Sequence, residues 1–179
     1  MALRIDLNEL ADGRAWQIGQ AVLAASLESA AVVLDRRYRS PARGVLARGD
    51  DQQTIEVRWT SPGERAGEPG DDASETSEAS EASEHGAYAI AYGVLRDSFT
   101  FVARLEAFSG AEFMLRREGD PPHQHVRLVV SGLAQGSDRD VARHTRARLD
   151  LLTQGRSAYP GMVAVVRFQD PAVALAEVP

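Results

Sequence analysis

The sequence predicts an α+β fold in which a mixed β-sheet carries flanking helices. Three observations support this prediction. After residue 85 the hydrophobic pattern changes in the order helix, three strands, helix, strand, and before residue 61 it gives one long helix and two alternating strands. A strand trio followed by a crossover helix and a further strand produces a mixed sheet with helices on its faces. The 179 residues suit one domain.

The N-terminal part, residues 1–60, is expected to pack on this core as a helix and a hairpin. The helix should begin near residue 8 or 12 and end near residue 37, because apolar side chains recur there at helical spacing. Asp12-Gly13 is interpreted as either a cap or a break between two helical pieces. Residues 44–50 and 53–61 alternate between apolar and polar, with a polar GDDQ turn between them, which is typical of a β-hairpin. The apolar positions of the helix are Trp16, Val22, Leu23, Leu27, Ala30 and Leu34.

The segment 61–85 concentrates the acidity of the chain. It holds eight acidic residues and one arginine, which leaves 18 of the 26 acidic and 19 of the 20 basic residues elsewhere. The remainder is therefore nearly neutral. With its SEASEASE repeat and no large apolar side chain, the segment is predicted to be a disordered acidic loop. An alternative is an acidic docking or phosphorylation segment, since four serines adjoin glutamates: Ser74, Ser77, Ser80 and Ser83.

The C-terminal part, residues 86–179, is predicted to be the core. A helix should occupy residues 86–98, followed by strands at 99–108, 111–118 and 125–133. A second helix should begin after Ser137 as N-cap and end at Gly155, because Asp138 and Asp140 lie in its first turn and glycine favours the C-terminal cap. A continuous apolar run at 162–168 predicts a buried strand, and residues 170–179 are expected to be a trailing segment.

Five short stretches carry two resemblances. They are IDLNELADGRA near the N-terminus, EHGAYAIA at 84–91, FSGAEFML at 108–115, VRLVVSGL at 126–133 and YPGMVAVVRFQ at 159–169. In this order they resemble a family of uncharacterised bacterial proteins. The helix-strand-strand-strand-helix-strand order also resembles the core of PD-(D/E)XK nucleases.

The nuclease resemblance implies a metal site that this chain does not reproduce. In that fold, acids on the second and third strands bind a divalent metal that activates water against a phosphodiester. The first acid corresponds to Glu112, but the second falls on Val129 and the lysine that follows it falls on Ser131. The chain contains no lysine at all. The resemblance therefore implies a degenerate nuclease-like fold, and Glu112, Ser131 and the neighbouring Glu106 remain the candidate catalytic residues.

Histidines offer an alternative set of metal ligands. His123 and His125 are two residues apart on one strand face, which suits chelation together with Glu112. The plainer interpretation is a strand end that faces water. Asp140 and His144 are four apart on one helical face, and a surface pair is the simpler reading there. Cysteine is absent from the sequence, so disulfides and thiolate sites are excluded.

Arginines on the second helix are the candidate contacts for nucleic acid or another anion. Arg139, Arg143 and Arg146 share one face, although nearby aspartates reduce its charge. A solvated helix surface is the alternative.

These observations favour a non-catalytic binding or assembly protein that retains a degenerate nuclease-like fold. The alternatives are a divergent metal-dependent nuclease acting on DNA or RNA, and a subunit of a larger assembly. We expect no cofactor, with Mg²⁺ or Mn²⁺ required only under the nuclease alternative. We expect a protein partner or self-association, no membrane, and a cytoplasmic location, because no signal-peptide pattern is apparent at the N-terminus.

Overall fold

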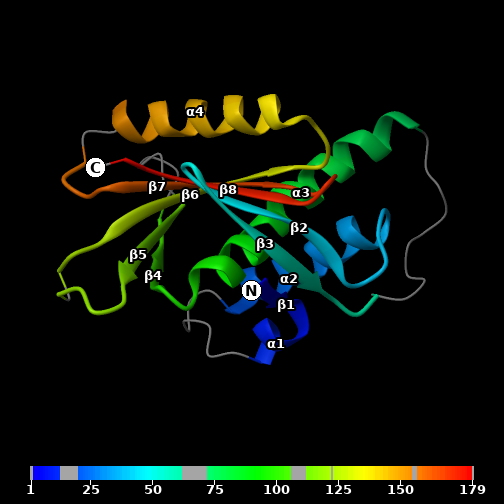
Figure 1. The fold of residues 1–179 in the computed structure, drawn as a ribbon, viewed down its shortest axis with the longest axis horizontal. Coiled ribbons are helices and arrows are strands. Elements are labelled where there is room, and N and C mark those ends of the chain that lie inside the picture. Colours follow the sequence, from blue (N-terminus) through cyan, green and yellow to red (C-terminus); the bar gives the residue numbers. More distant parts are fainter. Residues whose placement is uncertain are drawn as a thin grey trace.

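A computed structural model shows an eight-stranded sheet with helices on both faces (Figure 1). The structure describes residues 2–12, 20–61, 72–105, 112–121, 123–154 and 157–178. The strand order is β1-β3-β2-β8-β7-β6-β5-β4. Three neighbouring pairs are parallel, namely β1–β3, β2–β8 and β6–β7, and the others are antiparallel. The predicted α+β class with a mixed sheet is confirmed.

The N-terminal part contributes three strands to this sheet. The predicted hairpin is present as β2 (Ala42–Arg48) and β3 (Asp51–Arg58). The predicted helix begins as α1 (Leu7–Asp12), one residue before the earlier of the two expected starts, and residues 13–19, which include Trp16, lie outside the described part. Edge strand β1 (Leu3–Asp6) precedes α1 and was not predicted. The strand was missed because four residues, of which only Ile5 is fully buried, carry no readable alternation. Helix α2 follows at Gln20–Asp35.

Helix α3 (Asp72–Leu95) corrects the prediction of a disordered loop over 61–85. From residue 72 onward the acidic repeat is helical, whereas residues 62–71 lie outside the described part. Alanine and glutamate have high helix propensity, and extending an existing helix avoids the unfavourable nucleation step. The C-terminal half of α3 supplies that existing helix, because its apolar side chains are buried in the main core: Ala87, Ile90, Ala91, Val94 and Leu95.

The remaining predicted elements are present, with one further correction. Residues 170–179 are not a trailing segment, because residues 172–178 form β8 between β2 and β7. Strand β8 joins the N-terminal hairpin to the rest of the sheet. Its alternation of alanine with larger apolar residues is that of a strand, but the preceding Asp-Pro and the chain end concealed it. The bounds are β4 Phe99–Arg104, β5 Phe113–Arg117, β6 Val126–Leu133, α4 Asp138–Gln154, β7 Gly161–Arg167 and β8 Ala172–Val178.

The two faces of the sheet are covered unequally. Helices α1, α2 and α3 share one face, where the main core lies, whereas α4 alone packs on the other (Figure 1). Under α4, a smaller cluster joins Val129, Val163 and Val165 of the sheet to Val141 and Leu152 of the helix. None of the helices in the described residues combines the length and apolar composition that crossing a membrane requires.

Candidate functional site

A groove runs beside α4, over the part of the sheet that this helix leaves open. The cavity that contains this groove has a volume of about 1230 Å³ and extends to Leu95, Phe99 and Met162 of the main core. The groove floor consists of small side chains from β2 and β8, because Val45 and Ala47 pair with Ala172 and Ala174 in register on the same face. Val45 is 42% exposed. A floor of alanines lets an occupant approach the backbone closely. The wall from α4 is formed by Ala142, Thr145, Arg146 and Leu149.

Charged residues of both signs line this groove, with four arginines and three acidic residues: Arg43, Arg48, Arg146, Arg167, Asp138, Asp170 and Glu177. Asp138 at one end is paired with Arg167 at 2.8 Å. Glu177 is paired with Arg117 at 3.4 Å. By contrast, Arg48, Arg146 and Asp170 have no ion pair in the described part of the chain. Arg48 pairs in register with Leu175, so it belongs to the main-core face of β2 and not to the face of Val45 and Ala47.

On the far side of the groove, β3 carries a charged row. The Glu56 carboxylate forms ion pairs with Arg4, Arg43 and Arg58, with N–O distances of 3.9, 3.6 and 2.8 Å. Hydrogen bonding to Arg58 is the largest cause that lowers the pKa of Glu56, and the charges of the three arginines add to it. One carboxylate among three guanidinium groups leaves a surplus of positive charge on this side.

Two buried arginines hold α4 in place and so define the wall of the groove. At the N-terminal end, Arg167 donates to the carbonyls of Gly136 and Asp170 as well as to Asp138. The predicted N-cap is confirmed, because Ser137 accepts from the Asp140 amide at 3.4 Å and its own N–H donates to Asp140 at 2.9 Å.

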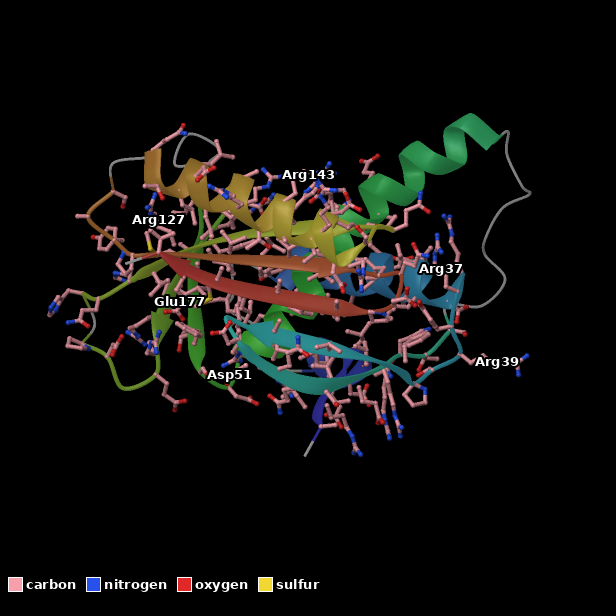
Figure 2. All side chains as sticks on the ribbon, turned by 45° about the horizontal axis from the view of Figure 1, so that its top comes forward. Arg37, Arg39, Asp51, Arg127, Arg143 and Glu177 are labelled. Atoms are coloured by element: carbon pink, nitrogen blue, oxygen red, sulfur yellow. The ribbon has the colours of Figure 1, made fainter. Side chains whose placement is uncertain are left out.

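At the C-terminal end, Arg127 of β6 donates to the carbonyls of Leu152 at 3.1 Å and Tyr159 at 3.3 Å. Figure 2 shows it beside this end of α4. The guanidinium complements the negative end of the helix dipole. Arg127 is only 5% exposed, and its Nη1 has no acceptor among the described residues. The predicted C-cap, Gly155, lies outside the described residues.

A pair of carboxylates, from α3 and from the residue before β5, lies at the edge of β6. Glu84 accepts hydrogen bonds from the Gly132 amide at 3.0 Å and from the Ser131 hydroxyl at 3.3 Å. Glu112 accepts from the Val130 amide. The pairing of β5 with β6 ends at Leu128, so these carboxylates satisfy amides on the stretch of β6 beyond it.

The pKa of Glu112 is raised above its ordinary value. Burial of the carboxyl group is the largest cause, although other parts of the residue remain exposed, and the negative charge of Glu84 adds to it. The positive charges of Arg148 and Arg104 act in the opposite direction. A carboxyl group with a raised pKa can donate a proton as a general acid does. Two neighbouring carboxylates can supply some of the oxygen ligands of a divalent cation.

The structure brings two of the three predicted catalytic candidates close to the same edge of β6. The Ser131 hydroxyl donates a hydrogen bond to Glu84, and the charge of Glu84 acts on Glu112. Ser131 is completely buried, so its hydroxyl is not accessible as a nucleophile. Glu106 lies outside the described residues. Val129, where the nuclease resemblance requires an acid, packs in the apolar cluster under α4.

The histidine candidates do not gather a ligand set among the residues that the structure describes. His123 is exposed in the turn before β6, and His125 is half-buried with its ring edge-on to Tyr159 at 5.8 Å. No group of three or more potential metal ligands occurs in the described ranges. Asp140, proposed as a partner of His144, is engaged in the helix cap and pairs with Arg143 at 2.9 Å.

The three predicted arginines are exposed on α4. Arg143 points outward from the helix (Figure 2), and Asp140 neutralises it. Arg146 lines the groove, whereas Arg139 does not. Sequence reasoning missed Glu84, Arg127 and Arg167, because each binds at least two groups that are 25 or more residues away in the sequence.

Comparison with known proteins found no match to this chain among family models, curated proteins or solved structures.

Proposed function

We propose that this chain is a non-catalytic binding protein whose groove beside α4 receives a helix of a protein partner. The observation that supports the proposal is the unequal covering of the sheet. A single helix covers one face, and beside it lies an accessible floor of alanine and valine. An accessible apolar floor with a polar rim is typical of surfaces that bind proteins.

The dimensions of the groove favour a helix as the occupant. From β8 across β2 and β3 to β1 there are three strand spacings, or about 14 Å. A helix with its side chains is about 10–12 Å wide, so one helix parallel to α4 would fill this strip. The positive rim favours acidic residues on the flanks of that helix. This mode of recognition places an amphipathic helix in an apolar groove.

A pull-down with matched variants tests the proposal. Val45 lies in the groove, whereas Val102 lies on β4, the edge strand at the far end of the sheet from β1. The two side chains are similarly exposed, at 42% for Val45 and 39% for Val102. We expect tagged wild-type protein and Val102→Asp to capture the same polypeptide from the native host, and Val45→Asp to lose it. Binding should then be reproduced with both proteins purified. Equal capture by all three proteins would contradict the proposal.

A second candidate, a divergent metal-dependent nuclease acting on DNA or RNA, is favoured by one observation. Glu84 and Glu112 are close enough for their charges to interact, and such a pair could hold Mg²⁺ or Mn²⁺ if it released the β6 amides. Under this candidate, purified protein cleaves nucleic acid when one of these ions is added, and Glu112→Gln abolishes cleavage. If cleavage is absent with every divalent ion tested, this candidate is excluded.

A further inference from the structure

Helix α3 extends beyond the sheet at its N-terminal end. An added Cβ at Gly132, the next-to-last residue of β6, would lie 2.0 Å from the carbonyl oxygen of Ser83. Ser83 therefore sits directly on the end of β6, and residues 72–82 continue past it. Figure 1 shows these turns projecting away from the sheet. Eleven helical residues span about 16 Å.

The composition of this extension complements the groove. Residues 72–82 contain four acidic residues, no basic residue, and otherwise only alanine, serine and threonine. Such a helix is narrow, so it can approach a floor of alanines closely. Its charge of −4 is opposite in sign to Arg146 on the α4 wall and to the three arginines that share Glu56, which together outweigh the one unpaired groove acid, Asp170. Its length also fits, because the seven residues of β2 span about 23 Å.

We infer that the occupant of the groove is the α3 extension of a second copy of this chain. The inference rests on the proposed function, because it identifies the helix that the groove receives. Two copies that exchange their extensions about a two-fold axis would fill both grooves and form a closed dimer. The contact is partly electrostatic, so added salt weakens it.

Sedimentation velocity with charge-reversal variants tests this inference. Wild-type protein should self-associate in a concentration-dependent manner. Glu78→Arg in the extension and Arg146→Glu in the groove should each weaken association at least about tenfold, which corresponds to the loss of one well-placed charge contact. Combining both substitutions should restore much of it. Arg139→Glu is the matched control, because Arg139 is exposed on the same helix but does not line the groove, and it should leave association unchanged.

Three results would overturn the inference: a wild-type monomer at every concentration, association that Arg146→Glu leaves intact, or equal weakening by Arg139→Glu. Circular dichroism of each variant establishes that it is folded, and recovery in the double variant excludes misfolding as the cause of weakening. A monomer that still captures a different protein through Val45 leaves the proposed function standing and removes only the second copy as partner. If wild type, Val45→Asp and Val102→Asp capture the same polypeptides equally, both the proposed function and this inference are contradicted.

Discussion

The contact between α3 and β6 allows a quantitative prediction at Gly132. An added Cβ would lie 2.0 Å from the carbonyl oxygen and 2.4 Å from the carbonyl carbon of Ser83, and 2.7 Å from the amide nitrogen of Glu84. Non-bonded atoms prefer about 3.5 Å, so Gly132→Ala would push α3 away by roughly 1.5 Å. Overpacking of this kind destabilises by about 1–3 kcal/mol. The shift also weakens the hydrogen bond from the Gly132 amide to the Glu84 carboxylate, worth about 1.5–3 kcal/mol.

We therefore expect Gly132→Ala to lower the free energy of unfolding by about 3–5 kcal/mol, measured by urea denaturation with circular dichroism. The control is Gly49→Ala in the β2–β3 turn, where nothing lies within 4 Å of an added Cβ. Because Gly49 has a φ of 59°, alanine there should cost about 1–2 kcal/mol from backbone conformation alone. Equal losses for the two variants would refute the reasoning that α3 rests directly on the backbone of β6.

Three further predictions concern stability. The raised pKa of Glu112 means that the protonated form is favoured in the folded state, so the associated stability is present below its ordinary value of 4.5 and is lost as the pH rises through the folded pKa. Glu112→Gln should therefore match wild type in urea denaturation at pH 4 and exceed it at pH 7; a difference independent of pH would contradict this. Arg127→Met should destabilise by about 2 kcal/mol, because the Leu152 and Tyr159 carbonyls lose a charged donor, and unchanged thermal stability would show that Arg127 does not hold α4. Ser137→Ala removes the N-cap of α4 and should cost about 1 kcal/mol in chemical denaturation; no loss would mean that Asp140 alone caps the helix.

The fold could be predicted where a segment carries a clear hydrophobic period. The second half of α3, strand β6 and strand β7 follow their patterns closely, and the N-cap at Ser137 was recognisable from the acids behind it. The failures occurred where local composition and tertiary context disagree. The acidic repeat lacks apolar residues, yet it is helical because α3 is anchored further along. Strand β8 resembled a chain end because no local feature reveals that β2 and β7 lie on either side of it.

The candidate site could be predicted only in part. Glu112 and Ser131 were recognisable as polar residues at strand ends, and the structure places them near each other. Their shared neighbour Glu84 is separated from Ser131 by 47 residues, and no sequence spacing links the two. The groove depends on the order of strands in the sheet, since β2 and β8 become neighbours only through a parallel pairing of distant segments. A pattern along one chain cannot reveal such a surface.

Site-specific photo-crosslinking tests the central claim, occupancy of the groove, most directly. A photoreactive amino acid replaces Val45 on the groove floor or, in the control protein, Val102 on the opposite side of the sheet. Illumination of intact cells of the native host should yield one defined adduct from position 45 and none from position 102, and mass spectrometry should map the cross-link to a helical, acidic segment. The segment 72–82 of a second copy is the expected match. Identical adducts from both positions, or no adduct from position 45, would contradict the claim that this groove is the binding site.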